Sequence, residues 1–213
     1  MSPKRRYAKA LRPALFSLCL LPLAWLAWRA GSGGLGANPI EAVNRYLGDW
    51  ALRFLLVALA VTPVTRLTGW TWLMARRRML GLFAFAYATL HLLSYVGLDQ
   101  FFDFADIGAD ILKRNYITVG MACYVILLAL AVTSPKAMVK RLGARSWKAL
   151  HRLVYAASVG AVFHFAMMIK ADLREPLIYA GILAVLLGFR AVTGLRRKFR
   201  PEGRRTRTDL VSG

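Results

Sequence analysis

The 213-residue sequence contains few acidic residues, three histidines and two cysteines. Asp and Glu number 10 against 30 Lys and Arg, which gives a formal net charge of +20. Cys19 and Cys123 both lie in apolar runs and form no Cys-x-x-Cys pair, which argues against a zinc ribbon, a dithiol redox site or covalent haem attachment. We expect both to be buried, unpaired thiols that pack as small hydrophobic side chains.

Charged residues are scarce overall, at 19%, whereas 58% of the residues are hydrophobic and the mean hydropathy is +0.47. Strongly basic soluble chains are typically nucleic-acid binders. Here the basic residues lie between long apolar runs instead of forming one polar face. The pattern therefore indicates an integral membrane protein and argues against nucleic-acid binding.

Six apolar segments are long enough, or nearly so, to cross a bilayer as helices, which takes about 20 residues each. They are residues 13–28, 50–65, 79–98, 115–135, 153–169 and 176–195. In lipid a helix satisfies its backbone hydrogen bonds within one segment. The sequence thus predicts an all-α integral membrane protein, a six-transmembrane-helix bundle over residues 13–195. A basic N-terminus (1–12) precedes it, and a basic tail (196–213) suited to anionic lipid heads follows it.

The charges also predict an orientation. If the six segments alternate in direction, 23 of the 30 basic residues lie on the side of the two termini. Eight of the ten acids lie on the opposite side, among them Asp99, Asp103, Asp106 and Asp110. The positive-inside rule then places both termini in the cytoplasm.

The three histidines all lie in or beside apolar spans, where an ionisable side chain points to function. His91 precedes Asp99 by eight residues and His164 precedes Lys170 by six, so both lie about 9–12 Å below the outer boundary. Two imidazoles at matched depth can ligate one haem iron from opposite faces, an arrangement that suits electron transfer.

His151 lies 13 residues before His164, about 20 Å closer to the cytoplasm. It could hold a second haem, with Met79 as the opposite ligand, or be a one-sided ligand or a structural residue. Zinc is the rival metal, but it prefers four grouped ligands and no carboxylate or cysteine accompanies these histidines in sequence. Arg53, expected just inside the outer boundary, either snorkels to the interface or pairs with a haem propionate.

Several segments carry a resemblance to a known family. They are Gly36–Glu41, Trp50–Leu56, Arg77–Leu82, Leu90–Leu92, Lys113–Gly120 and Trp147–Tyr155. Through them the chain resembles the ferric reductase-like transmembrane superfamily and, within it, the MsrQ (formerly YedZ) family. Members of that family are the haem-binding membrane subunits of periplasmic methionine sulfoxide reductase systems in the bacterial inner membrane.

The resemblance implies an electron conduit with haem b and FMN, fed by the quinone pool or a cytoplasmic flavin reductase. Its partner would be MsrP, a periplasmic molybdenum-containing reductase that repairs oxidised proteins. His91, His151 and His164 match the family's haem histidines. The superfamily's inner haem has a further histidine on the third helix, which is missing here, so one or two haems are implied. No flavin-binding residue is indicated.

No Gly-x-Gly-x-x-Gly motif and no alternating strand–helix pattern follows the sixth predicted helix. We therefore expect a non-catalytic electron-transfer subunit that takes its electrons from another protein or from quinol. Three rivals stay open on the sequence: a ferric reductase or superoxide-producing cytochrome b, a haem sensor or carrier, and a transporter with structural histidines.

Overall fold

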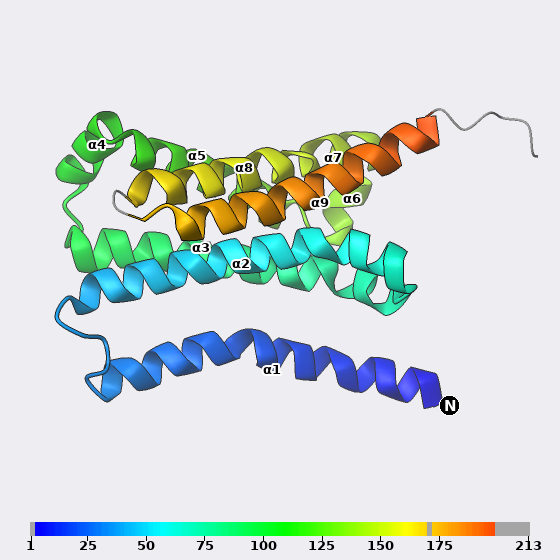
Figure 1. Cartoon of the computed structure of the whole chain (residues 1–213), viewed down its shortest axis with the longest axis horizontal. Coiled ribbons are helices and arrows are strands. Elements are labelled where there is room, and N and C mark those ends of the chain that lie inside the picture. The colour runs from blue at the N-terminus through cyan, green and yellow to red at the C-terminus, as the bar shows by residue number, and fades with distance from the viewer. Residues whose placement is uncertain (1–2, 170–171, 199–213) are drawn as a thin grey trace, which may run out of the picture.

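The computed structural model describes residues 3–169 and 172–198, and these form helices and loops without a β-strand (Figure 1). The long helices are α1 (Pro3–Gly31), α2 (Pro39–Thr68), α3 (Arg77–Ser94), α5 (Asn115–Val132), α8 (Leu153–Met168) and α9 (Arg174–Lys198). Shorter elements connect them: η1 (Thr71–Arg76), η2 (Tyr95–Asp99), α4 (Phe104–Lys113), α6 (Lys136–Leu142) and α7 (Ala144–His151). The predicted all-α membrane fold is confirmed.

The longest helix, α2, has clear local signals at both ends. The Asn38 side chain accepts a hydrogen bond from the Glu41 amide at 3.3 Å, and Pro39 occupies the first turn, where its missing N–H costs nothing. At the other end Gly69 adopts the left-handed conformation with φ 74°, and its N–H bonds to the Thr65 carbonyl. These caps start α2 eleven residues before the predicted span, which puts its first three turns at the cavity described below.

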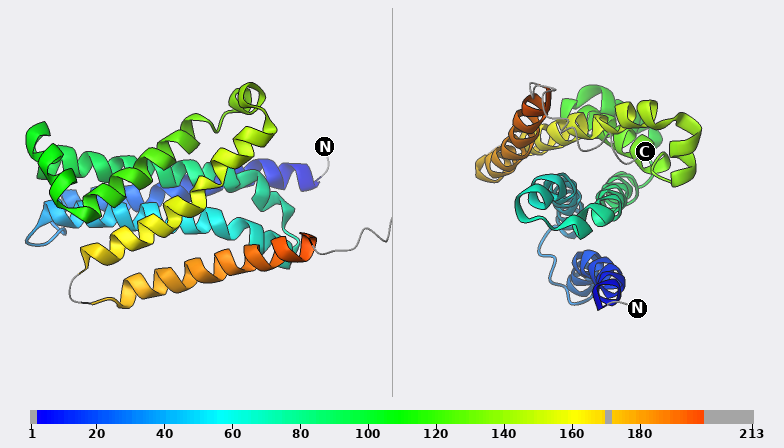
Figure 2. Two further views of the ribbon diagram at one scale, coloured as in Figure 1. Left: turned by 90° about the horizontal axis from the view of Figure 1, so that it is seen from above. Right: turned by 90° about the vertical axis from the view of Figure 1, so that its right-hand side faces the viewer.

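The bundle consists of two antiparallel helix pairs, α2 with α3 and α5 with α8, while α9 lies beside α2 and α8 (Figures 1 and 2). Helix α1 runs along the outside of the α2–α3 pair (Figure 2). A core cluster joins these three helices through Phe54, Phe83 and the fully buried Tyr87, whose hydroxyl donates to the Cys19 carbonyl at 2.8 Å. A second cluster packs the opposite side of α2 against α8 and α9. Helix α2 is therefore the central element.

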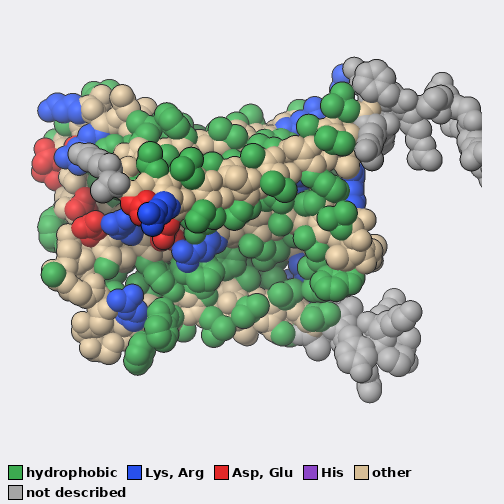
Figure 3. Space-filling model, viewed as in Figure 1, with side chains coloured by type: hydrophobic (Ala, Val, Ile, Leu, Met, Phe, Trp, Pro, Cys, Tyr) green, Lys and Arg blue, Asp and Glu red, His purple; other side chains and the backbone are tan. Residues whose placement is uncertain are grey.

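Hydrophobic side chains cover the middle of the molecule and charged ones gather towards its two ends (Figure 3). Five described helical segments are long and apolar enough to cross a membrane: 11–31, 39–68, 71–99, 115–132 and 174–195. The sixth predicted span, 153–169, corresponds to α8, which has 16 residues and is shorter than a typical span. Only a turn at Arg152 separates α8 from α7, so the two helices nearly continue one another.

The domain boundaries predicted from charge differ from the helix ends. Helix α1 already begins at Pro3, within the predicted N-terminal segment 1–12, and α9 continues to Lys198, three residues into the predicted tail 196–213. The rest of that tail, residues 199–213, lies outside the described residues. Both cysteines are buried and unpaired, as predicted.

The orientation can be tested by cysteine labelling, because α4 and α7 lie towards opposite ends of the bundle (Figure 1). Asp103 caps α4, Ala144 begins α7, and both residues are exposed. We expect Asp103→Cys to react with a membrane-impermeant thiol reagent in intact cells and Ala144→Cys to react only after lysis. The parent chain is the control, since Cys19 and Cys123 are buried. The reverse labelling pattern would contradict cytoplasmic termini.

Candidate functional site

His91 and His164 line one cavity of about 380 Å³ between the two antiparallel helix pairs. Helices α2 and α3 form one wall, and α5 and α8 form the other. The lining is mostly apolar, with Leu52, Leu55 and Phe165 among its residues. Polar side chains lie towards the end where α4 and the aspartates are found. The structure thus brings together two histidines that are 73 residues apart in sequence.

His91, on α3, is fixed by the facing helix α2. Its Nδ1 lies 2.9 Å from the Asn44 carbonyl oxygen, so the neutral ring donates from Nδ1. The Asn44 side chain holds the same turn of α3, because its Nδ2 donates to the hydroxyl of the buried Ser94 at 3.0 Å. That hydroxyl in turn donates to the His91 carbonyl at 2.8 Å. The main chain of Asn44 therefore fixes the His91 ring, and its side chain fixes the backbone of His91 through Ser94.

His164, on α8, is fixed in the same way by α5. Its Nδ1 lies 2.7 Å from the Tyr116 carbonyl oxygen. Glycines follow both carbonyls by four residues, Gly48 after Asn44 and Gly120 after Tyr116, and both glycines line the cavity. Within the described residues neither histidine Nε2 forms a hydrogen bond. The Nε2 lone pair of each ring is thus available to a ligand.

The two imidazole rings have centroids 6.3 Å apart and planes inclined at 72°. A metal–imidazole nitrogen bond is about 2 Å long and the nitrogen lies about 1 Å from the ring centre, so two axial imidazoles on one metal have centroids about 6 Å apart. The observed separation meets that requirement. The residues present therefore fit a haem held between them.

The surroundings do not suit zinc. Among residues 3–169 and 172–198, no group of three or more His, Cys, Asp or Glu side chains could hold a metal ion. A zinc site needs at least three such ligands. Two imidazoles that line a mostly apolar cavity instead suit a metal whose other ligands belong to a bound macrocycle.

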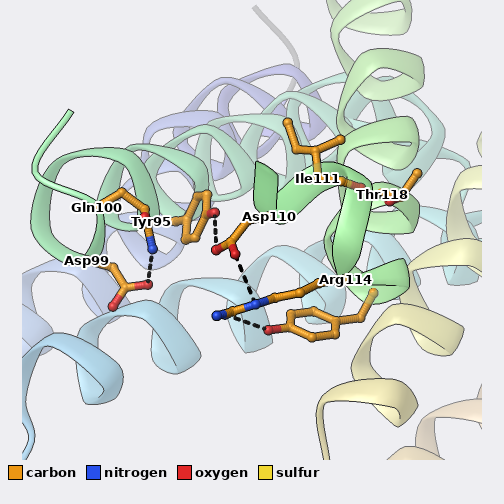
Figure 4. A network of polar contacts seen from close by, with 8 residues as sticks. Tyr95, Asp99, Gln100, Asp110, Ile111, Arg114 and Thr118 are labelled. Carbon is orange, nitrogen blue, oxygen red and sulfur yellow. Dashed lines mark hydrogen bonds and ion pairs between the residues drawn. The ribbon is translucent and has the colours of Figure 1, made fainter. Parts of the chain in front are cut away.

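A polar network lies beside the cavity and includes three of its lining residues, Tyr95, Arg114 and Tyr116 (Figure 4). Asp110 on α4 accepts hydrogen bonds from the Tyr95 hydroxyl at 3.1 Å and from Arg114 Nε at 3.0 Å. Arg114 also donates to the Tyr116 hydroxyl at 3.2 Å. The bond to Tyr116 and the Asp110 carboxylate raise the pKa of Arg114. The network ties α4 to the helix that carries His91 and to the residue whose carbonyl holds His164.

His151 lies elsewhere, at the end of α7, and does not line this cavity. Its ring stacks on Trp147 at 3.9 Å, and its Nδ1 lies 3.2 Å from the Trp147 carbonyl oxygen. Partial burial lowers the pKa of His151, while hydrogen bonds to the Trp147 and Leu130 carbonyls act in the opposite direction. Met79 packs against the core shared by α1, α2 and α3, and no described contact joins it to His151.

Arg53 also lies outside the histidine cavity. It lies about midway along α2. Its Nε donates to the Tyr179 hydroxyl of α9 at 2.9 Å, and its guanidinium lies 5.1 Å from the Trp50 ring centre. The arginines that do line the cavity are Arg45 and Arg114.

Sequence reasoning missed the residues that hold the histidines. Asn44 and Tyr116 act through main-chain carbonyls, which leave no residue-type signature. Gly48 and Gly120 are two of 17 glycines, and glycine is common in membrane helices. The one sequence signal for these glycines is that each lies at about the same expected depth in the membrane as one histidine on the next helix of its pair.

The network beside the cavity predicts a local stability effect. Asp110→Asn removes the charge that holds Arg114, and we expect a loss of about 1–2 kcal/mol in the local stability of α4. Faster amide hydrogen exchange across α4 is the expected readout. Asp106→Asn, an exposed change on the same helix, is the control. Equal exchange rates in the two variants would show that the network does not hold α4.

Comparison with known proteins gives one consistent result. The sequence profile of the ferric reductase like transmembrane component matches residues 47–162. A protein of Rhodospirillum rubrum named protein-methionine-sulfoxide reductase heme-binding subunit MsrQ is 60% identical over 187 residues, 88% of this chain and 90% of that protein.

Two further proteins with the same name are similar over nearly the whole chain. That of Azospira oryzae is 48% identical, covering 91% of this chain and 84% of its own length, and that of Caulobacter vibrioides is 47% identical, covering 91% and 94%. These relatives match nearly the whole chain at 47–60% identity, and the membrane-domain profile matches its central part, so they share one fold with this chain. This chain belongs to the MsrQ family of the ferric reductase-like transmembrane proteins.

Proposed function

We propose that this chain is the haem b-binding electron-transfer subunit of a methionine sulfoxide reductase system. The observation that carries the proposal is the pair His91 and His164, with ring centroids 6.3 Å apart and each Nδ1 engaged by a main-chain carbonyl. The relatives from three organisms bear names that describe a heme-binding subunit of protein-methionine-sulfoxide reductase. The ligands we assign are His91 and His164.

When bound between two imidazoles, haem supplies one-electron transfer and leaves no open coordination position for a substrate. The chain's own residues set the conditions for this. The Asn44 and Tyr116 carbonyls fix the tautomer in which Nε2 carries the lone pair. The cavity lining is mostly apolar, and its two arginines are each paired with a carboxylate: Arg45 with Glu41 at 3.4 Å and Arg114 with Asp110 at 3.0 Å. The haem propionates would be further carboxylates that these guanidinium groups could bind. Arg53 is left with a structural role through Tyr179.

Ligand substitution tests the assignment. His91→Ala or His164→Ala would remove one of the two residues that we propose hold the haem iron, and we expect the low-spin haem spectrum of the purified protein to be lost or its haem content to fall severalfold. His151→Ala is the matched control, because this ring contacts Trp147 outside the cavity. A wild-type spectrum in both cavity variants would refute the assignment.

We place the FMN implied by the family at the opposite end of the bundle. There Arg190 donates to the Tyr155 hydroxyl at 3.0 Å and to the Leu59 carbonyl, while its Nε is buried without a partner among the described residues. Arg77 also interacts with Tyr155 and is close enough to Arg190 for repulsion. Among the described residues no ion pair joins Arg77 or Arg190 to a carboxylate. Two neighbouring arginines of this kind suit a phosphate group.

Electrons would enter at that basic end, from the quinone pool or a cytoplasmic flavin reductase, and leave through the His91–His164 site. The acceptor we propose is a periplasmic molybdenum-containing reductase of the MsrP type. At the exit end, Asp99 lines the cavity and Asp106 is exposed on α4. In sequence the exposed Phe101, Phe102 and Phe104 lie between these two acids, and we call Asp99 and Asp106 the acidic rim. Acidic and apolar side chains in one exposed segment favour a partner with a basic docking face. This proposal places the chain in the bacterial inner membrane with cytoplasmic termini.

The acidic rim gives a kinetic prediction. Asp103 caps α4 and Asp110 holds Arg114, so only Asp99 and Asp106 can be neutralised without removing a structural contact at α4. We expect Asp99→Asn with Asp106→Asn to slow haem reoxidation by the reductase severalfold at low salt and to flatten its salt dependence, because charge steering is screened by salt. An unchanged rate at both salt concentrations would exclude this surface as the docking site.

A further inference from the structure

We propose that Gly48 and Gly120 are positioning residues for the two histidines. Each leaves open the space in which one imidazole lies against the facing helix, and so lets that ring reach a main-chain carbonyl. The inference rests on the proposed function, because it concerns how the two proposed haem ligands are held.

Gly48 lies directly against His91. A Cβ at this position would be 3.1 Å from Cε1 and 3.2 Å from Nδ1 of the His91 ring. Carbon atoms in ordinary contact stand about 3.5–4.0 Å apart, so an alanine methyl would require the ring to shift.

Gly120 lies still closer to His164. A Cβ here would be 2.9 Å from Cε1 and 3.0 Å from Nδ1 of the His164 ring. That separation is too short for any real side-chain contact. The position accepts only glycine while His164 keeps its place.

Helix geometry explains why glycine stands four residues after the accepting carbonyl. In an α-helix the carbonyl of residue i points towards residue i+4, whose N–H it accepts. A second donor from a neighbouring helix must approach that oxygen from the side, over residue i+4. Asn44 and Gly48, and likewise Tyr116 and Gly120, have this spacing.

The hydrogen bonds of the two imidazole rings oppose the movement that an added methyl group would require. Each Nδ1 is held by its carbonyl at 2.9 or 2.7 Å, and the Asn44 side chain and Ser94 additionally hold the backbone of His91. A displaced ring would lose the Nδ1–H hydrogen bond and change its angle in the cavity. Substitution at these glycines therefore acts on the ligand.

The same device occurs in both helix pairs. His91 is 47 residues after Asn44, and His164 is 48 residues after Tyr116. In each pair the first helix supplies the carbonyl and the glycine, and the antiparallel second helix supplies the histidine. At Gly81 and Gly181, in contrast, an added Cβ would have no neighbouring atom within 4 Å. Contact with an imidazole distinguishes Gly48 and Gly120 from the other glycines of the described helices.

The hydrogen bond gives this device an electronic consequence. An Nδ1–H that donates to a carbonyl makes the imidazole a more basic ligand and stabilises the ferric state. Loss of that bond makes the ligand less basic, so the midpoint potential of the haem should rise. A residue that merely packed helices together would not shift the potential in this way.

The experiment uses the full-length, detergent-purified protein with Gly48→Ala and Gly120→Ala as separate variants. We expect both to change the low-spin electron paramagnetic resonance spectrum and to raise the midpoint potential. Gly120→Ala should have the larger effect and a severalfold lower haem content, since its methyl would stand closer to the ring. Gly48→Ala needs a displacement of only a few tenths of an ångström, so it keeps the inference testable should Gly120→Ala fold poorly.

Two glycines provide controls. Gly181→Ala meets open space and should match the wild type. Gly81→Ala, on the helix that carries His91, also meets open space and should match the wild type. A wild-type spectrum and potential in folded Gly48→Ala would overturn the inference. The same shift in Gly81→Ala would overturn it too, because a general effect of alanine in these helices would then explain the result.

Failure of the proposed function would look different. In that case the wild-type protein would lack low-spin haem, or His91→Ala and His164→Ala would retain it. Failure of the positioning role alone would leave both histidine variants defective and both glycine variants normal.

Discussion

The hydrogen bond from each cavity histidine to a main-chain carbonyl of the facing helix is the interaction on which the site depends. It fixes the tautomer, so that Nε2 and not Nδ1 is free. It also fixes the ring against a helix that cannot rotate without breaking the bundle. Helix α2 has this role for His91 while it packs both core clusters, so the position of one ligand is coupled to the whole fold.

The membrane sets the second constraint. A polar group in lipid needs a partner within the protein, and the polar side chains of the bundle satisfy this in pairs between helices. Tyr87 reaches the Cys19 carbonyl, Arg53 reaches Tyr179 and Arg190 reaches Tyr155. Within the described structure the two uncommitted Nε2 atoms depart from this pattern, as do the buried Trp50 Nε1, Thr62 Oγ1 and Arg190 Nε. Of these, only the two Nε2 atoms belong to residues that line the His91–His164 cavity. Such atoms are candidates for binding a ligand.

Much of the fold could be predicted from composition and charge. The apolar runs indicated the membrane helices, and the distance of His91 and His164 from the outer charges indicated that they would meet. The start of the short helix α8 was harder to predict, because α8 follows α7 after a single turn residue and no sharp boundary separates them in sequence. The predicted second span began at residue 50 instead of Pro39 because the Asn38 cap and Pro39 were not read as the start of a helix.

The finer features of the site depend on tertiary contacts that no local pattern records. Which arginines line the cavity is decided by the rotation of α2, which turns Arg45 towards the histidines and Arg53 towards α9. The role of Gly48 becomes visible only when the ring of His91, 43 residues later, is placed against it. Sequence patterns indicate depth along a helix well, but they do not indicate which neighbouring helix a given face will meet.

The central claim is that His91 and His164 ligate one iron through Nε2. Pulsed electron paramagnetic resonance on protein labelled with ¹⁵N only at histidine, in a His151→Gln background, tests it most directly, since two histidines then remain. The account predicts two directly coordinated histidine nitrogens on one low-spin ferric centre. A single coordinated nitrogen, or none, would contradict it.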